Sequence, residues 1–367
     1  MLAGDTGFYD DYDSYHHNVY HQATIAHNSI VVYNGNTAHG QLTGLYLNDS
    51  MSYSDWKNGK DSTYKTATLD GVSYKYDANG KPKYAYIAGD ISNQYYELTT
   101  NEIFGSIIQT KGSKLLDKAD RRMLSIFNTQ NPDVPMYFFV YDNVTTKKTN
   151  YQTTFLLHTA AEPTINGNTV TVTSNSNKKT GGQLVLQNVK GGSSITKIGG
   201  TNNNYVVNGS QVATSGGEND CYWGRVEIKV ATGSTSQVML NVMYVTDNGK
   251  TLSLPAMGFE TDKVDGAAIG NTVGVFLKNT TNNTDNITFT APNTGSGSKV
   301  FYYVSGMADG QWTIKCGTQI INITLDEDDG GLLVFNTYAG KEVTITRNAG
   351  SSGGSSTDNE LPMDPAN

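Results

Sequence analysis

The stretch "MYFFVYDNVTTKKTNYQTTFLLHT" fills residues 136–159. Its two ends, 136–144 and 151–159, are dominated by β-branched and aromatic side chains, which suit the pleated, half-buried surface of a strand. The short segment between them is polar and contains Thr, Lys and Asn. The stretch therefore predicts two strands joined by a short polar connection.

Segments of the same kind recur at short intervals along the chain. They are separated by turn-forming clusters such as "INGNT" and "TDNGK". Many short strands with turn chemistry between them favour a β-sandwich or barrel over alternating strands and helices. The further predicted strands are 28–33, 168–174, 182–189, 224–230, 237–246, 272–279, 286–292, 299–307, 311–316, 331–337 and 342–347.

Helical periodicity is weak throughout the chain. Only "SKLLDKADRRMLSIF", residues 113–127, can be interpreted as a helix, and its end "RRMLSIF" also fits a strand that follows a polar turn. We prefer the strand. The predicted fold class is all-β, a large antiparallel β-sandwich followed by a small C-terminal β-domain.

The domain boundaries are predicted from composition. The segment 278–286, "KNTTNNTDN", is polar and rich in turn formers, which places a β-sandwich at 1–280 and a small β-domain at 281–348. The tail 349–367 is rich in Gly and Ser and then carries Pro. It is expected to be disordered, because it cannot bury enough apolar surface to fold.

Composition narrows the classes of partner. The 367 residues carry a formal net charge of −8, which argues against a broad phosphate-binding surface and hence against nucleic acid. A local site for an anionic ligand is still compatible with this charge. No run of about 18 apolar residues is present, so no membrane span is predicted.

Two other features bear on cellular location. Met1 is not followed by a basic start and an apolar stretch, so either the protein is cytosolic or its true N-terminus lies upstream. Cys221 and Cys316 are far apart in sequence, and we expect both to be buried hydrophobes rather than a disulfide or a metal site.

Residues 2–33 concentrate four of the six histidines together with many aspartates and tyrosines. Asp5 lies in a turn-like "GDTG", and His27 lies where an apolar strand begins. A carboxylate and an imidazole are suitable ligands for Zn²⁺ or a similar divalent ion, although a stable site needs a third protein ligand. The alternative is that Asp5 forms a turn and His27 satisfies a strand end.

The other candidates are open to two interpretations. His16 and His17 fit a solvated loop or a carbohydrate contact, whereas His158, within an apolar run, fits a buried and hydrogen-bonded histidine. The tyrosines near the N-terminus, Tyr9 and Tyr15 among them, could stack on sugar rings or simply pack a long loop. No P-loop, GxGxxG, GxSxG or HExxH motif is present.

Five segments in order resemble the heparinase II/III-type polysaccharide lyases. "DTGFY" and "TIAHNSI" resemble the "D-x-G-x-Y" turn and the "T-x-A-H-N-[ST]-[ILV]" motif of that family. The segments "YAYIAGDISNQYY", "RRMLSIFNTQNPDVPMYFFVYDNV" and "TTFLLHTAAEPTINGNTVTVT" follow, and then the strands "GRVEIKV" and "QVMLNVMYVT". Ser92 stands where the family usually has Thr.

The resemblance implies a fold and a metal site. Such lyases carry an N-terminal (α/α) toroid, a large β-sandwich and often a small β-domain. They bind a divalent metal, usually zinc, through the aspartate of "D-x-G", the histidine of "A-H-N" and a histidine of an "H-x-H-x-D" motif. Asp5 and His27 match the first two in this chain, and the third would precede residue 1. The catalytic residues are also expected upstream, which leaves Tyr9 and Tyr15 as the substrate-contact candidates in this chain.

The resemblance also implies a function. The chain would be a fragment of a lyase that cleaves heparin-like, heparan-like or alginate polysaccharide by β-elimination, inactive without the toroid. The full-length protein would be secreted, periplasmic or at the cell surface, with acidic polysaccharide as its partner. The alternatives are a non-catalytic carbohydrate-binding or structural β-sandwich and an accessory domain of a glycoside hydrolase.

Overall fold

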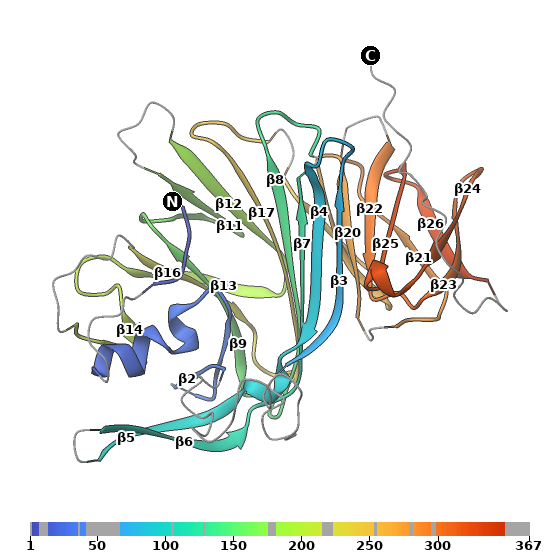
Figure 1. Ribbon diagram of the computed structural model, residues 1–367. Helices are drawn as coiled ribbons and strands as arrows, with labels where there is room; N and C mark the ends of the chain where they lie inside the picture. The colour runs from blue at the N-terminus through green and yellow to red at the C-terminus, as the bar shows by residue number, and fades with distance from the viewer. Residues whose placement is uncertain are drawn as a thin grey trace.

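Four β-sheets stack face to face in the computed structural model (Figure 1). The fold is all-β, as predicted, with several antiparallel sheets. Among the described residues, no helix is long and apolar enough to cross a membrane. The structure describes residues 2–6, 14–35, 37–41, 67–103, 106–127, 129–174, 181–214, 223–252, 255–278, 282–294 and 299–348.

The stretch 136–159 forms two strands in two different sheets. Strand β8 (Met136–Thr146) lies in an eight-stranded sheet, and β9 (Gln152–Thr159) lies in a five-stranded sheet, here called the N-terminal sheet. Both predicted strands are confirmed, and the polar connection between them carries the chain from one layer to the next. The N-terminal sheet has the order β13 (Gly192–Gly199), β16 (Gly224–Val230), β9, β1 (Ile30–Tyr33) and β2 (Ala38–His39).

The eight-stranded sheet is antiparallel throughout. All but the last residue of the segment "RRMLSIF" (121–127) belongs to its strand β7, so the strand interpretation is confirmed over the helix. The sheet has the order β10 (Thr164–Asn166), β11 (Thr169–Thr173), β12 (Gly182–Lys190), β17 (Ser236–Asp247), β8, β7 (Leu116–Ile126), β4 (Pro82–Asp90) and β3 (Thr68–Tyr76).

Strand β8 is buried on both faces. Val140 and Val144 pack with the N-terminal sheet, whereas Phe139 and Tyr141 pack toward the C-terminal part of the chain. Successive side chains point to opposite faces of a strand, so a strand that is covered on both sides must be apolar at nearly every position. The Tyr141 ring stacks on Phe276 with centroids 4.9 Å apart.

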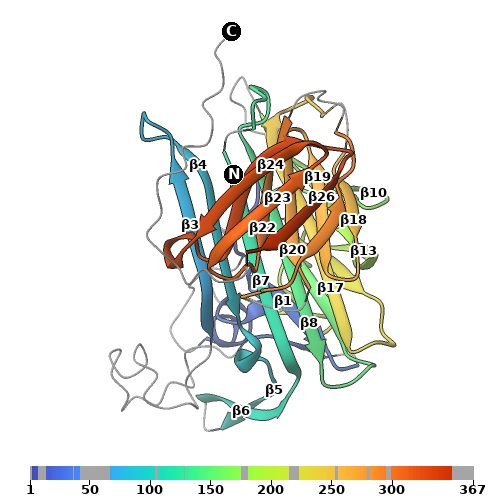
Figure 2. The ribbon, with the colours of Figure 1, turned by 90° about the vertical axis from the view of Figure 1, so that its right-hand side faces the viewer.

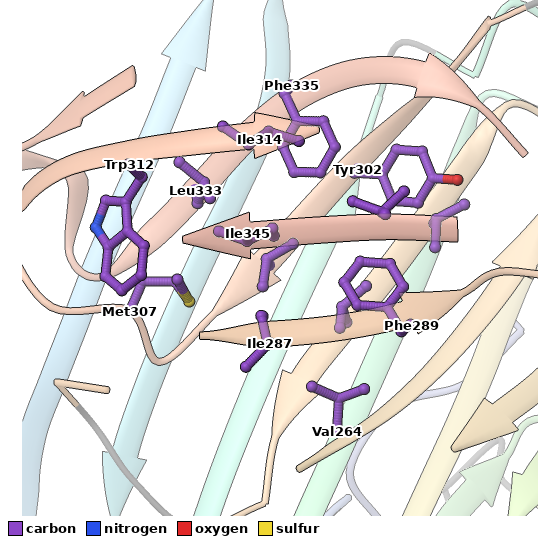
Figure 3. Packing of buried hydrophobic residues seen from close by; sticks show 14 of the residues in the cluster. Val264, Ile287, Phe289, Tyr302, Met307, Trp312, Ile314, Leu333, Phe335 and Ile345 are labelled. Carbon is purple, nitrogen blue, oxygen red and sulfur yellow. The ribbon is translucent and has the colours of Figure 1, made fainter. Parts of the chain in front are cut away.

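The C-terminal part is itself a two-layer sandwich (Figure 2). Its core includes the stacked rings of Tyr302 and Phe335, 5.0 Å apart, and the fully buried Trp312 (Figure 3). One layer contains β18 (Met257–Glu260), β19 (Val264–Ile269), β20 (Thr272–Leu277), β22 (Lys299–Ser305) and β25 (Leu332–Tyr338). The other contains β21 (Ile287–Thr290), β26 (Glu342–Arg347), β23 (Gly310–Cys316) and β24 (Gln319–Leu325).

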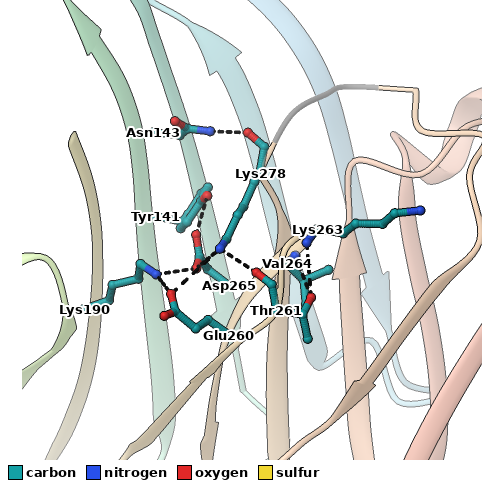
Figure 4. A network of polar contacts seen from close by, with 9 residues as sticks. All are labelled: Tyr141, Asn143, Lys190, Glu260, Thr261, Lys263, Val264, Asp265 and Lys278. Atoms are coloured by element: carbon teal, nitrogen blue, oxygen red, sulfur yellow. Dashed lines mark hydrogen bonds and ion pairs between the residues drawn. The ribbon is translucent and has the colours of Figure 1, made fainter. Parts of the chain in front are cut away.

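A buried carboxylate joins the eight-stranded sheet to the C-terminal sandwich (Figure 4). Asp265 is 0 % exposed and accepts a hydrogen bond of 3.0 Å from the Tyr141 hydroxyl. The ammonium groups of Lys190 and Lys278 lie 2.8 and 3.5 Å from its other oxygen. Because a buried ion is costly without partners, these contacts fix how the two layers pack.

The predicted boundary at residue 280 stays a prediction. Strands β18 to β20 precede it, yet they share one sheet with β22 and β25, which follow it. Cys316 is buried and unpaired, as expected, whereas Cys221 and the tail 349–367 lie outside the described residues.

Smaller elements complete the described fold. The hairpin of β5 and β6 extends from the lower end of the molecule in Figure 1. The chain's short helical turns and remaining strands are η1 (His17–His21), η2 (Thr24–Ala26), η5 (Ser92–Gln94), η6 (Glu327–Asp329), β5 (Tyr96–Ile103), β6 (Ser106–Lys114), β14 (Val206–Val207) and β15 (Ser210–Gln211).

A buried and an exposed isoleucine allow a mutational test of the C-terminal core. Ile314 is 0 % exposed on β23, and Ile320 is 64 % exposed on the neighbouring β24. We expect Ile314→Ala to lower the free energy of unfolding by about 2–5 kcal/mol, because it removes buried methyl groups and leaves a cavity. Ile320→Ala should change it by less than about 0.5 kcal/mol. Urea unfolding followed by tryptophan fluorescence measures both, and equal losses would contradict the assigned core.

Candidate functional site

The N-terminal segment lies against the end of strand β9. Ala3 forms a β-bridge with Thr159, and the Gly4 amide donates to the His158 carbonyl at 3.4 Å. The Thr6 amide then donates to the Ala26 carbonyl at 2.9 Å. Asp5 is therefore held by backbone contacts on both sides, between β9 and the turn η2.

Asp5 and His27 lie side by side although 22 residues separate them. The Nδ1–H of His27 donates to Asp5 Oδ2 at 3.0 Å, and both side chains are about half exposed, 56 % for Asp5 and 40 % for His27. Burial by itself raises the pKa of Asp5. Hydrogen bonds from His27 and Asn28 outweigh that effect, so the pKa of this carboxyl lies below its ordinary value.

The other oxygen of Asp5 is held by Asn28. The Asn28 backbone amide donates to Oδ1 at 3.0 Å, and its side-chain Nδ2 donates to the same atom at 3.2 Å. The carboxylate is therefore fully oriented, with Oδ1 toward Asn28 and Oδ2 toward His27.

A buried ion pair stands behind this group. Arg121 on β7 makes a two-pronged contact with Asp142 on β8, at 2.6 and 3.1 Å, and its Nη1 reaches the Asn28 carbonyl at 3.4 Å. Burial lowers the pKa of Arg121, but the charge of Asp142 outweighs it and raises that pKa overall. The guanidinium therefore stays charged, and its position is set by the eight-stranded sheet.

His158 lies beneath the same group. It is 0 % exposed, and its Nε2 lies 2.9 Å from the Ile25 carbonyl. Because a carbonyl can only accept, Nε2 carries the proton. Burial and the nearby Arg225 lower the pKa of His158 to about 3. The predicted buried, hydrogen-bonded histidine is confirmed.

The solvated-loop interpretation of His16 and His17 is wrong, since they are only 1 % and 5 % exposed. His16 packs on Tyr20 and Tyr205, with ring centroids 5.4 and 4.8 Å apart. These aromatic contacts bury the segment. Because Tyr205 is distant in sequence, the residues near His16 do not indicate this burial. Tyr15 is 58 % exposed. Tyr9 lies outside the described residues.

The separation of Asp5 and His27 can be compared with the spacing of zinc ligands. Two ligands of a tetrahedral zinc ion lie roughly 3.3 Å apart, because each bond is about 2.0–2.1 Å long. The separation of 3.0 Å between Asp5 Oδ2 and His27 Nδ1 is close to this value. Within the described ranges, however, no group of three or more His, Cys, Asp or Glu side chains could hold a metal ion. The contact seen is a hydrogen bond, and His27 Nδ1 would have to lose its proton before this pair could offer two donor atoms to a metal ion.

An exposed apolar surface adjoins the site. In the register of the eight-stranded sheet, Arg121 pairs with Gly89, which pairs with Leu69 on the edge strand β3. Leu69 is 65 % exposed, and further exposed apolar residues follow on β3 and β4. They are Val72, Tyr74, Tyr76 and Ile87.

Comparison with known proteins places part of the chain in a family. Residues 258–347 match the family model of the heparinase II C-terminal domain, and this segment is a heparinase II/III-type C-terminal domain. The match is independent of the motifs that carry the sequence resemblance, because those motifs all lie before residue 258. No curated protein matches the chain.

Solved structures give a weaker likeness. A chain described as "Heparinase III-BT4657 gene product" is 11% identical with a TM-score of 0.39, covering 72% of this chain and 32% of that one. A second, described as "Heparinase III-BT4657 gene product, Methylated Lysines", is 11% identical with a TM-score of 0.30, covering 92% and 38%. This chain thus spans about a third of the length of these solved chains.

Sequence reasoning found Asp5 and His27 but missed the residues that hold them. Asn28, Arg121 and Asp142 were present in the quoted family-like segments as the residue after "AH", the leading arginine and the aspartate of "VYDNV". The motifs contain all three residues, but no feature of the sequence around them indicates that these three segments meet in the fold.

The buried His158 gives a prediction for pH. Its pKa is about 3 in the folded protein and 6.5 as the ordinary value, so the unfolded chain binds a proton first as the pH falls. The free energy of unfolding should therefore decrease between about pH 6.5 and pH 3, by up to about 1.4 kcal/mol per pH unit from this residue. In His158→Gln this contribution should vanish. Urea unfolding at a series of pH values measures the slopes, and parallel profiles for the two proteins would refute the assignment.

Proposed function

We propose that this chain is the β-sheet portion of a polysaccharide lyase that acts on uronic-acid polysaccharides. The observation that carries the proposal is the contact between Asp5 and His27, which joins the two residues matching the family's metal-ligand motifs. The heparinase II/III-type C-terminal domain at 258–347 supports it.

The reaction of such an enzyme sets what the site must do. A base removes the acidic proton at C5 of the uronate, negative charge builds on the carboxylate, and an acid protonates the leaving oxygen at C4. The charge must be met by fixed positive or hydrogen-bonding groups. The formal net charge of −8 would repel an acidic polysaccharide, so attraction must be local.

In this proposal the chain supplies one wall of the cleft. Asp5 and His27 provide two ligands of a divalent ion, best fitted by zinc, whose charge would hold the wall and neighbouring segments in register. Tyr9 and Tyr15 are the proposed substrate contacts, and the exposed surface from Leu69 to Tyr76 would extend the wall. The base and acid would come from groups other than the residues assigned here.

The proposal extends to location and partner. A protein that degrades acidic polysaccharide meets its substrate outside the cytoplasm, so we place the full-length protein in the periplasm, at the cell surface or in the medium. Heparin-like, heparan-like and alginate chains share the uronate on which the chemistry acts.

A non-catalytic carbohydrate-binding module is the second candidate. It is favoured by the absence of a three-donor metal group among the described side chains. The exposed Tyr74 and Tyr76 could then contact sugar without any reaction. The two functions differ in product, because only a lyase creates a new double bond in the uronate.

The metal ligands give a test. In the full-length protein we expect bound zinc by elemental analysis, and ultraviolet-absorbing unsaturated uronate from heparin, heparan sulfate or alginate. Asp5→Ala and His27→Ala should each lose most of both, because each removes a ligand. Asp133→Ala is the control, since Asp133 is 54 % exposed and pairs with Lys250 at the surface.

The outcomes separate the two candidates. Polysaccharide binding without unsaturated product would favour the binding module. For residues 1–367 alone we expect weak metal affinity, because the described side chains supply only two donors. One tightly held zinc per chain in that protein would contradict the two-donor assignment.

A further inference from the structure

All four polar groups of Asn28 are occupied, and they reach three different segments. Its backbone N–H and side-chain Nδ2 both donate to Asp5 Oδ1, at 3.0 and 3.2 Å. Its Oδ1 accepts the His158 backbone N–H at 2.8 Å. Its carbonyl accepts from Arg121 Nη1 at 3.4 Å. One residue thus joins the N-terminal segment, strand β9 and strand β7.

These contacts control the orientation of the Asp5 carboxylate. Two donors on Oδ1 fix the rotation of the carboxyl group, and this leaves Oδ2 facing His27 Nδ1 at 3.0 Å. Asn28 directly follows His27 in sequence, so the same residue holds the backbone from which the imidazole projects. The side chain and the backbone amide of Asn28 therefore fix the positions of both Asp5 Oδ2 and the His27 imidazole.

The supports of Asn28 are rigid. The His158 amide belongs to β9, which is paired with β1 and β16. The Arg121 guanidinium is locked by its two-pronged contact with the 1 % exposed Asp142. A ligand pair gains affinity when its geometry is fixed before binding, because less ordering remains to be done.

We propose that Asn28 is the positioning residue of the Asp5–His27 pair, acting through Asp5 to preset the separation of the two donor atoms. The inference rests on the proposed function in one respect, namely that the ligand of the pair is a divalent metal ion. Asn28 itself touches no metal. Its role is to hold Oδ1 of Asp5 by two hydrogen bonds, so that Oδ2 of Asp5 faces His27.

Asn28 is exposed, so a purely structural role predicts a small effect of its removal on the fold and none on the site. A positioning role predicts instead that removal of the side chain weakens metal binding more than it destabilises the fold. In the full-length protein, Asn28→Ala should raise the dissociation constant for Zn²⁺ about 10–100-fold, the usual effect of losing a group that orients a metal ligand. Isothermal titration with Zn²⁺ measures this constant.

The matched control is Asn168, an exposed asparagine in the turn between β10 and β11. Its Nδ2 donates to the Asn188 carbonyl at 3.0 Å, and its Oδ1 accepts from Thr169 at 3.3 Å. Asn168→Ala therefore removes the same kinds of side-chain contact far from the site. It should leave the dissociation constant for Zn²⁺ unchanged.

A metal-free measurement keeps the inference separate from the proposed function. The imidazole ¹⁵N signals of His27 report its hydrogen bond to Asp5, and they should shift in Asn28→Ala and in Asn28→Asp. The aspartate variant retains an acceptor for the His158 amide, but it replaces the side-chain donor to Asp5 Oδ1 with a second carboxylate and so adds a negative charge beside Asp5. Unchanged His27 signals in both variants would overturn the positioning role.

The combined outcomes are distinct. Wild-type protein that binds no Zn²⁺, with His27 signals that still shift in the variants, refutes the metal proposal and retains the positioning of the pair. Zn²⁺ binding of equal strength in wild type and Asn28→Ala refutes the positioning role and retains the metal proposal.

Discussion

The structure depends on the burial of the central strands of the eight-stranded sheet on both faces. Strand β8 packs Val140 toward the N-terminal sheet and Phe139 toward the C-terminal sandwich, and its first six residues, 136–141, are all apolar or aromatic. Such a strand has no face on which a polar side chain can meet water freely. Each charged residue within it therefore needs a partner in the same layer, and these pairs become fixed points from which other segments are positioned.

The adjacent arginines of β7 show how this requirement leads to the site. Arg122 faces the C-terminal sandwich, where it pairs with Asp120 at 2.7 Å and contacts Ser305. Arg121 faces the other way, pairs with Asp142 and reaches Asn28. The first pair serves packing between layers. The second pair contacts the Asn28 carbonyl and, through Asn28, gives the Asp5–His27 pair a fixed support.

The interface between the two halves follows the same rule. Asp265 is buried among Lys190, Lys278 and Tyr141, and proximity to that carboxylate together with burial raises the pKa of the tyrosine. Burial is the larger cause. The C-terminal sandwich is therefore attached through satisfied charge as well as through apolar contact.

The sequence by itself determined the strands and the all-β class, and it singled out Asp5 and His27 as a candidate pair, because β-branched periodicity and short motifs are local properties. It did not determine that β8 and β9 enter different sheets, or that His16 is buried on Tyr205. It also gave no sign that Asn28 meets β7 and β9. These facts were decided by the tertiary structure, since they depend on which faces are covered, and burial of a face is a property of the assembled layers rather than of any one segment.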